Sequence, residues 1–391
     1  MRRDNRHFSD AARNPCSCIM SDMTANEPHD AGRFDDDMKA LLHGAADREA
    51  SDVHLVPGYP PTLRVHGRLE STGAGVLEPE TVLRMVRSIL PDRLWLRLDQ
   101  EKNFDCSLAL EHKGRPCRFR ANVYLAQGQW CVCLRHVPND IPSFDWMGFP
   151  RGLAERLVHH HNGLVIITGV TGSGKSTTLA AMINLLNEAG GSRIITVEEP
   201  IEYVHQPAGT SIITQREVGR DVDSFYDGLK YGLRQDPDVV LVGEIRDHET
   251  AQMALSAAET GHLILTTLHT KDAKGAVTRM IDLFPHDSHD DVRTQLSLSL
   301  RSVISQHLLP PTDQGEKRVL ALEVMHVNQP VRAAIKFGKI ESMETAIQTG
   351  KRDGMRALDD DLIRLAMTGK ITMETARRFA KDPDAIGQRA Q

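Results

Sequence analysis

The spacing of polar and apolar residues changes along this chain and separates an N-terminal tail from two patterned regions. Residues 1–33 are polar and lack hydrophobic periodicity, which predicts a disordered tail. Patterning begins near Phe34, so Met20 and Met23 compete with Met1 as the translation start. From 34 to 139, short alternating runs are mixed with two helical patterns, which predicts an α+β domain with an antiparallel sheet. The expected strands include 52–56, 62–66, 118–124 and 130–135, and the expected helices are 36–48 and 78–90.

After a proline-rich linker at 138–142 the pattern changes to buried strands that alternate with helices. This alternation predicts a parallel sheet with helices packed on it, and ligands at the carboxyl ends of its strands. We assign residues 140–310 to this α/β core and residues 311–391 to a C-terminal helical region. The expected strands are 164–168, 193–198, 211–215, 239–243 and 263–268, and the expected helices are 176–188, 223–235, 248–260 and 289–307.

Composition narrows the choice of function classes. The 391 residues carry a net charge of −6, which gives no general attraction to nucleic acid and disfavours a helicase or translocase. No apolar run approaches the roughly 18 residues that a spanning helix needs, so we expect no direct membrane insertion and any membrane association to depend on a partner. The six cysteines lack the C-x-x-C spacing of zinc sites, and a packing role is expected for Cys131 and Cys133, which share one face of a strand.

One glycine-rich segment identifies a ligand class. It fits the pattern G-x-x-x-x-G-K-[ST], follows a buried strand and precedes a helix, as in loops whose backbone N–H groups surround nucleotide phosphates. We expect Lys175 to reach the β- and γ-phosphates and Ser176 to bind Mg²⁺. The chain is therefore predicted to bind a nucleoside triphosphate with Mg²⁺. The predicted binding residues are Gly169, Val170, Thr171, Gly172, Ser173, Gly174, Lys175, Ser176 and Thr177.

Acidic residues follow two of the strands in this core. Glu244 follows 239–243, where a neighbouring acid in phosphate-loop enzymes meets Mg²⁺ or the attacking water. Because Gly243 stands where many such enzymes keep the magnesium-binding aspartate, Glu244 is the candidate general base. Glu198, with Glu199 and Glu202, ends another strand and is the candidate carboxylate near the metal. The structural alternatives are a solvent-facing strand end for Glu244 and a solvated acidic loop for the Glu198 cluster.

Histidine and arginine supply the remaining candidates. His269 ends the strand 263–268 and could sense the γ-phosphate, whereas His262 at its start is a weaker candidate. Arg234 and Arg246 flank the Glu244 strand and could orient Glu244 or contact a neighbouring molecule. In the first domain, Arg118 and Arg120 alternate on one strand and Arg135 lies on the next. They could complete a phosphate site from another domain or subunit, although a solvated strand face is the usual interpretation of such spacing. The catalytic candidates therefore also include Arg118, Arg120 and Arg135.

Together these motifs resemble the secretion-superfamily ATPases, and most closely the twitching-motility ATPases of type IV pili. The resemblance covers about residues 36–383. It rests on an N-terminal signature, an arginine strand, a Walker A loop, an acidic "Asp box", an atypical Walker B strand and a "His box". In chain order these are residues 50–67, 118–122 with Arg135, 169–177, 196–203, 241–247 and 260–270.

The resemblance implies a PAS-like N-terminal domain over 34–139, a RecA-like core and a helical C-terminal region. It also implies a homohexameric ATPase that rotates domains on hydrolysis. Such a ring would work at the cytoplasmic face of the inner membrane on a pilus platform protein, with or without a paralogous ATPase. The expected function is therefore an ATP-hydrolysing motor of type IV pilus retraction.

Departures from the family pattern keep alternatives open. Val170 replaces a proline, Glu199 replaces an aspartate, and the retraction-associated motif is partly kept at 330–339. The tetracysteine zinc motif of the extension and type II secretion branches is missing from the sequence. The alternatives are an ATPase of a type II or type IVB secretion or conjugation system, a nucleic-acid translocase, and a non-hydrolysing assembly subunit.

Overall fold

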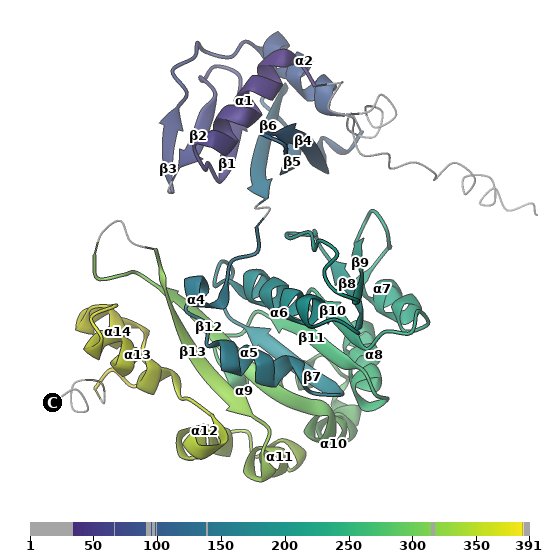
Figure 1. Cartoon of the computed structure of the whole chain (residues 1–391), viewed down its shortest axis with the longest axis vertical. Helices are drawn as coiled ribbons and strands as arrows, with labels where there is room; N and C mark the ends of the chain where they lie inside the picture. Colours follow the sequence, from purple (N-terminus) through teal and green to yellow (C-terminus); the bar gives the residue numbers. More distant parts are fainter. Residues whose placement is uncertain are drawn as a thin grey trace, which may run out of the picture. The chain divides into compact units, whose positions relative to one another are not determined.

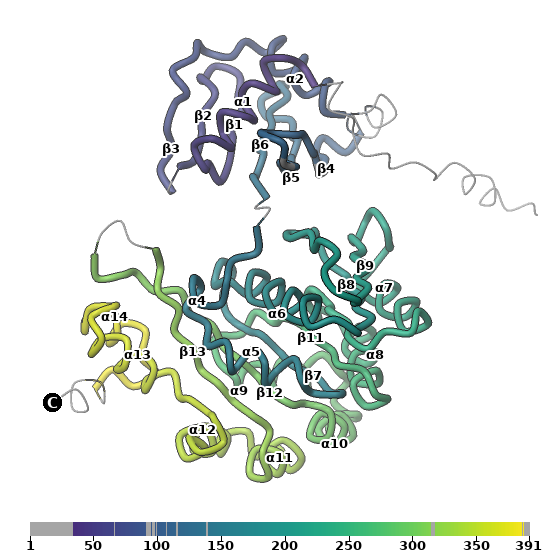
Figure 2. Tube along the Cα trace, viewed as in Figure 1, coloured from purple at the N-terminus to yellow at the C-terminus, as the bar shows by residue number. Residues whose placement is uncertain are grey.

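The computed structural model describes residues 34–65, 67–90, 95, 98, 100–137, 140–313, 317–384 and 386, so the tail expected at 1–33 lies outside the described residues. The chain divides into two compact units, with the boundary between Asn139 and Asp140. Each unit has its own sheet (Figure 1), and the path of the chain through both can be followed in Figure 2. Within the described residues, no helix has the length and apolar character needed to cross a bilayer.

The first unit is a six-stranded antiparallel sheet with the strand order β3-β2-β1-β6-β5-β4, as the alternating runs predicted. Helices α1 and α2 pack on it. Asp35 caps the first of them by accepting hydrogen bonds from the N–H groups of Asp37 and Met38. The elements are α1 (Asp36–Asp47), β1 (Asp52–Leu55), β2 (Thr62–Val65), β3 (Arg68–Ser71), α2 (Pro79–Ile89), β4 (Asn103–His112), β5 (Arg115–Ala126) and β6 (Gln129–Val137).

Burial in this unit follows the period of two that a half-buried strand requires. In β5, Cys117, Phe119 and Ala121 are buried against the helices, with Met38 and Val82 in the same core. The residues between them, Arg118 and Arg120 among them, therefore lie on the opposite face.

The second unit is a seven-stranded sheet in the order β13-β12-β7-β11-β10-β8-β9. All neighbouring pairs are parallel except β12 and β13, which are antiparallel. The predicted α/β core with a parallel sheet is confirmed. Its strands are β7 (Gly163–Thr168), β8 (Arg193–Glu198), β9 (Ile212–Glu217), β10 (Val239–Val242), β11 (Leu263–Leu268), β12 (Leu300–Leu309) and β13 (Val319–His326).

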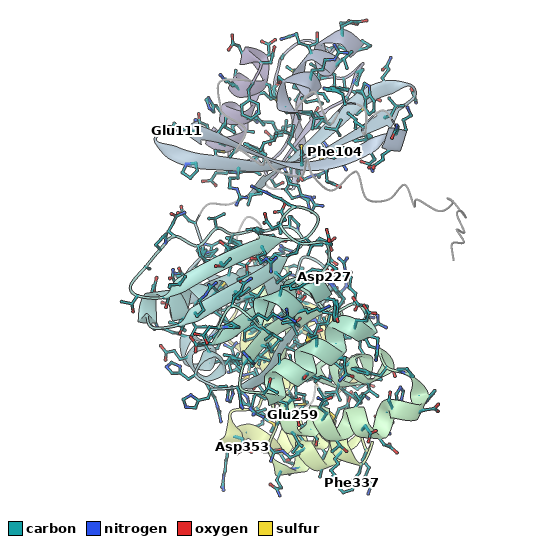
Figure 3. The ribbon with its side chains drawn as sticks, turned by 90° about the vertical axis from the view of Figure 1, so that its right-hand side faces the viewer. Phe104, Glu111, Asp227, Glu259, Phe337 and Asp353 are labelled. Atoms are coloured by element: carbon teal, nitrogen blue, oxygen red, sulfur yellow. The ribbon has the colours of Figure 1, made fainter. Side chains whose placement is uncertain are left out.

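Helices cover both faces of this sheet (Figures 1 and 3). Successive residues of β7 belong to different cores: Leu164 and Ile166 to one, Val165 and Ile167 to the other. This double burial explains why β7 is a continuous apolar run. The helices are α4 (Phe144–Met147), α5 (Arg151–Val158), α6 (Lys175–Ala189), α7 (Phe225–Gly232), α8 (His248–Glu259), α9 (Ala273–Asp282), η1 (His286–Ser288) and α10 (His289–Ser299).

The helix expected over 289–307 is wrong in its second half. The helix α10 ends at Ser299, and Leu300–Leu309 form strand β12, which pairs with β7 and β13. Apolar residues at 296, 300, 303 and 304 fit a helical period. Residues 300–309 nevertheless form a strand, because they pair with the edge of β7 that β11 leaves open. Strand β13 likewise adds a sheet strand to the region expected to be helical from 311.

The rest of the second unit is helical, as expected after residue 327. Its elements are α11 (Gln329–Lys336), α12 (Ser342–Thr349), η2 (Gly350–Asp353), α13 (Leu358–Met367) and α14 (Met373–Phe379). The last two helices form a small core of their own against Leu309 and Ala321 of the last two strands. Asp361 of α13 is buried and accepts a hydrogen bond from the N–H of Leu322, so this end of the chain is fixed to the sheet.

Candidate functional site

The glycine-rich loop lies between β7 and α6, at the carboxyl end of the sheet. Gly169 has φ +145°, and a Cβ there would lie 2.5 Å from both the Gln306 carbonyl oxygen and Ser173 Oγ, so only glycine fits. Helix α6 has no side-chain cap, which leaves the N–H groups of its first turn for a ligand. Ser173 Oγ is buried and makes no hydrogen bond in the described structure. These features suit a bound phosphate group.

Lys175 is buried at the start of α6. Its ammonium donates hydrogen bonds to the carbonyl oxygens of Gly169 (3.0 Å) and Val170 (3.2 Å), so it lies inside the loop. Burial lowers the pKa of Lys175, against the opposing charges of Glu244 and Glu202. A buried cation with its donors turned into the loop is well placed to bind an anion there.

Glu244 follows β10, two strands from β7 in the sheet order, and lies in an ionic cluster. Its carboxylate is 15% exposed, accepts a hydrogen bond from Arg246 and lies 3.2 Å from Nε2 of His269. The other terminal nitrogen of Arg246 donates to Glu199 at 2.8 Å. Burial alone would raise the pKa of Glu244, but Arg246 and His269 together hold it below its usual value. The carboxylate is therefore ionised and able to accept a proton.

Gly243, in place of the expected aspartate, has a packing reason. A Cβ there would lie 3.2 Å from the Val197 carbonyl oxygen and 3.4 Å from Glu198 Cα. The backbone of β8 thus leaves little room for a side chain at 243, and the acid at this strand end is the next residue, Glu244.

Glu198 ends β8 and is held by two donors. Its Oε1 accepts hydrogen bonds from Thr196 Oγ1 (2.6 Å) and Gln215 Nε2 (3.2 Å). Burial raises the pKa of Glu198, and the charges of Glu202 and Glu217 raise it further. A group of acids that disfavour one another's ionisation would be stabilised by a nearby cation.

The residues fit Mg²⁺ held jointly with a nucleotide. The described residues include no cluster of three metal-ligating side chains, so they contain no all-protein cage. Mg²⁺ usually takes one or two protein ligands and completes its shell with water and substrate phosphates. The exposed Ser176 on the first turn of α6, together with the acids at the end of β8, provides such a partial set.

The two histidines of the "His box" lie at opposite ends of β11. His269 follows the carboxyl end, on the same side as the phosphate loop, and contacts Glu244. His262 precedes the amino end, and its Nδ1 lies 3.1 Å from the carbonyl oxygen of Ala257. Only His269 is therefore near the candidate chemistry.

The three candidate arginines of the first unit share one face of its sheet. Arg120 and Arg135 are direct partners in the β5–β6 register, and Arg118 lies two residues before Arg120. Arg135 donates to Asp52 at 2.9 Å, and Arg120 lies 3.5 Å from Asp105. The structure brings these arginines together as a basic face, on which Arg135 is exposed and Arg118 and Arg120 are half-buried.

Two neighbours of the phosphate loop were not among the predicted site residues, although the first of them ends the "Asp box" at 196–203. The Tyr203 hydroxyl lies 3.1 Å from Thr177 Oγ1 and joins the loop helix to the segment after Glu198. Arg318, just before β13, donates to the Gly172 carbonyl oxygen at 3.3 Å. The expected helical region thus contributes a cation to the loop, which local pattern could not reveal.

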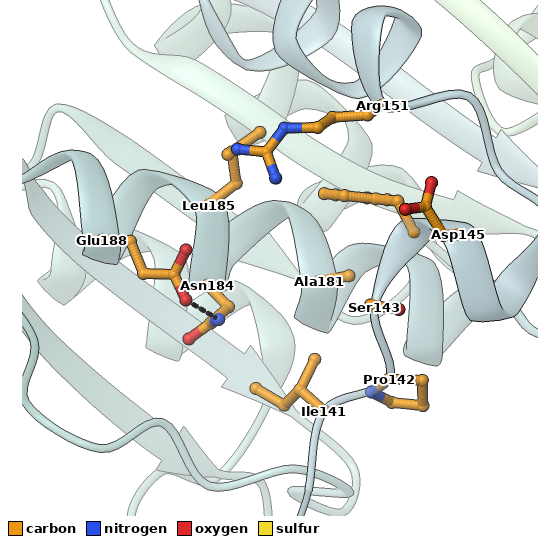
Figure 4. Close-up of a pocket in the computed structure, with 10 residues that line it drawn as sticks. Ile141, Pro142, Ser143, Asp145, Arg151, Ala181, Asn184, Leu185 and Glu188 are labelled. Atoms are coloured by element: carbon orange, nitrogen blue, oxygen red, sulfur yellow. Dashed lines mark hydrogen bonds between the residues drawn. The ribbon is translucent and has the colours of Figure 1, made fainter.

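A separate pocket of about 250 Å³ lies beside the later turns of α6 (Figure 4). Its wall is part apolar and part polar, and Asn184 donates to Glu188 within it. None of the predicted site residues lines it. The lining residues are Ile141, Pro142, Ser143, Phe144, Asp145, Arg151, Ala181, Asn184, Leu185 and Glu188.

Comparison with known proteins gives consistent matches over most of the chain. The family described as "Type II/IV secretion system protein" matches residues 27–376. The type IV pilus retraction ATPase PilT of Pseudomonas aeruginosa is 40% identical over 348 residues, which are 89% of this chain and 99% of that protein. The type IV pilus ATPase PilU of the same organism is 37% identical, with 88% of each chain covered.

A solved structure agrees with these sequence matches. A crystal structure described as the pilus retraction motor PilT with bound ADP has a TM-score of 0.81 and 38% identity, covering 89% of this chain and 98% of that one. The expected resemblance to pilus-retraction ATPases and the expected α/β ATPase fold are confirmed. The chain belongs to the type II/IV secretion system protein family.

Proposed function

We propose that this protein is an ATP-hydrolysing motor that powers type IV pilus retraction. The observation that carries the proposal is the ionised Glu244, held by Arg246 and His269 at the same sheet edge as the phosphate loop. The similarity to a retraction motor crystallised with ADP supports the same reaction for this chain.

In the proposed mechanism the loop residues 169–177 bind the phosphates, and Lys175 turns from the loop carbonyls toward the β- and γ-phosphates. Bound Mg²⁺, held by Ser176 and Glu198, would neutralise charge on the phosphate oxygens. Glu244 takes the proton of the attacking water, since each carboxylate oxygen keeps a lone pair beyond its present contact. His269, which contacts Glu244, would sense whether a γ-phosphate is present.

The proposal includes a homohexameric ring in which the basic face of the first unit serves a neighbouring site. Arg118, Arg120 and Arg135 would stabilise the charge that develops on the transferring phosphoryl group, as arginine fingers do. The ring would work at the cytoplasmic face of the inner membrane on a platform protein. The similarity to PilU as well as PilT is compatible with a paralogous ATPase partner.

The test is ATP hydrolysis by the purified protein on a column that reports mass, for the wild type and Glu244→Gln. We expect hydrolysis by a ring of about six subunits, with ATP binding kept and turnover lost in the variant. Equal loss of binding and turnover would contradict the role of Glu244 as the base. A monomer that binds ATP without turnover would count against the motor.

The intersubunit role of the arginines has its own test. Rings of Arg120→Ala alone and of Lys175→Ala alone should both be inactive. Mixed rings should regain part of the activity, because some sites then combine an intact loop with an intact arginine. Failure of every mixture to recover activity would place the arginine's role within one subunit.

A further inference from the structure

A lysine near the end of the described chain contacts two acids at the end of residues 269–272, the segment between β11 and α9 that we call the catalytic loop. Lys381 follows α14, and its Nζ lies 2.6 Å from Glu323 Oε2 and 3.5 Å from Asp272 Oδ2. Glu323, on β13, is only 2% exposed, and among the described residues Lys381 is the cation in contact with it. Removal of one partner from a buried ion pair leaves an uncompensated charge. Loss of the Lys381 ammonium should therefore destabilise the surroundings of Glu323.

The same carboxylate fixes the start of α9. Glu323 Oε1 accepts a hydrogen bond from the N–H of Ala273 at 2.8 Å, in a buried position. Asp272, the other partner of Lys381, caps α9 by accepting from the N–H of Gly275 at 2.7 Å. Lys381 therefore neutralises both acids at the start of this helix.

The loop between β11 and α9 is short and carries His269 at its beginning. Thr270 donates its N–H to Thr168 Oγ1 (3.0 Å) and its hydroxyl to the Asp272 carbonyl oxygen (3.1 Å). Ser305 Oγ donates to the Lys271 carbonyl oxygen at 2.8 Å. Hydrogen bonds thus hold each residue of 269–272 that follows His269. The last of them, Asp272, is one of the two acids that Lys381 contacts.

The position of Lys381 is itself set by α13. The two oxygens of Asp359 accept hydrogen bonds from the N–H groups of Lys381 (2.8 Å) and Asp382 (3.0 Å). Asp361, two residues later, is bound to the Leu322 N–H and paired with Arg356 and Arg364. Helix α13 therefore holds the backbone of Lys381 in place, and α13 is itself bonded to β13, the strand that carries Glu323.

We propose that Lys381 is a positioning residue for His269, through which the C-terminal helices α13 and α14 hold the catalytic loop against Glu244. The proposal rests on the proposed roles of His269 and Glu244. Without Lys381, the buried carboxylate of Glu323 loses the cation that contacts it, which weakens its hold on the N–H of Ala273 at the start of α9. Residues 269–272 then lose the anchor at their far end and keep those at Thr270 and Lys271, so His269 holds its 3.2 Å contact with Glu244 for a smaller fraction of the time.

The first test compares ATPase kinetics of Lys381→Met with those of Lys351→Met, a matched control whose ammonium pairs with Asp360 at 2.7 Å on an exposed part of the same region. We expect kcat to fall about 3- to 30-fold in Lys381→Met, with the KM for ATP nearly unchanged because the phosphate loop is not touched. The control should keep its kcat. Activity of folded Lys381→Met within about twofold of the wild type would overturn the proposal.

A double-mutant cycle separates positioning from general stability. In a His269→Ala background, Lys381→Met should lower kcat little further, because the residue that it positions is already missing. Independent, additive losses would overturn the proposal. The variant Lys381→Met/Glu323→Gln removes both charges and keeps an acceptor for Ala273 N–H, so it should fold and recover most of the lost kcat even if the single variant unfolds.

Hydrogen–deuterium exchange gives a readout that does not depend on catalysis. A peptide covering 269–275 should exchange faster in Lys381→Met than in the wild type or Lys351→Met. Unchanged exchange would overturn the positioning role even if ATPase activity is measurable. Faster exchange in a protein that lacks any ATPase activity would keep the positioning role and reject the proposed function instead.

Discussion

Arg246 is the residue whose removal tests the electrostatics of the site most directly. It donates hydrogen bonds to Glu244 and Glu199, and Glu244 has His269 as its second contact. Burial of Glu244 favours its protonated form, and the positive neighbours reverse this preference and lower its pKa. The variant Arg246→Gln keeps a donor but removes the charge, so the pKa of Glu244 should rise.

The expected size of that rise follows from the geometry. A hydrogen bond to a charged group contributes about 1.5–3 kcal/mol, which corresponds to about one to two pKa units. Because the Arg246 side chain is 57% exposed, solvent screening reduces its effect, and we expect a rise of about one unit. Glu244 then stays ionised near neutral pH, so the main change should be in the acid limb of the kcat profile.

The assay is phosphate release at saturating ATP from about pH 5 to about pH 9. The control is Arg234→Gln, the other arginine considered for orienting Glu244, because its guanidinium lies over the Tyr231 ring at 5.9 Å whereas the described contacts of Glu244 are with Arg246 and His269. The acid limb should move up by about one unit in Arg246→Gln and stay in place in the control. A loss of kcat by the same factor at every pH would refute the reasoning, because it would mean that Arg246 positions Glu244 without setting its charge.

Two further predictions concern the loop and the response to acid. Gly169→Ala places a Cβ 2.5 Å from the Gln306 carbonyl oxygen and should weaken binding of a fluorescent ATP analogue by about tenfold or more, whereas Gly44→Ala in α1, where a Cβ meets nothing, should not. Burial lowers the pKa of His205 and of His326 to about 4, so between about pH 6.5 and about pH 4 the unfolded chain binds more protons and stability falls as the pH falls. At about pH 5 the loss should be about 2 kcal/mol for each histidine, and urea unfolding at two pH values should show a shallower decline for His326→Gln; an equal decline would contradict this.

The sequence predicted the elements whose pattern is local. The phosphate loop needs glycines and a lysine at fixed spacing, and β7 shows its double burial as an apolar run from 164 to 167. In the half-buried strand β5, the alternation of apolar and polar residues in the sequence indicates which residues face the core. These features depend on neighbours within a few residues, so a single sequence contains them.

The parts that the sequence did not reveal depend on distant partners. Strand β12 has residues compatible with a helix and becomes a strand because it pairs with β7. Glu198 is held by Gln215 on the next strand, and no local spacing predicts that contact. Arg246 was a candidate to orient Glu244, but its simultaneous bond to Glu199 joins two strand ends and required the folded sheet.

The place of β7 between β11 and β12 also bears on how the protein is made. Gly163 pairs with Leu263, and Leu164 pairs with Leu300. The strand that leads into the phosphate loop, β7, therefore cannot form its sheet contacts until β11 and β12 have been synthesised. At the usual rate of synthesis that interval is on the order of ten seconds. A nascent chain therefore exposes its phosphate loop well before the strands that shape it exist. A chain stalled before β12 should emerge from the ribosome without a formed nucleotide site.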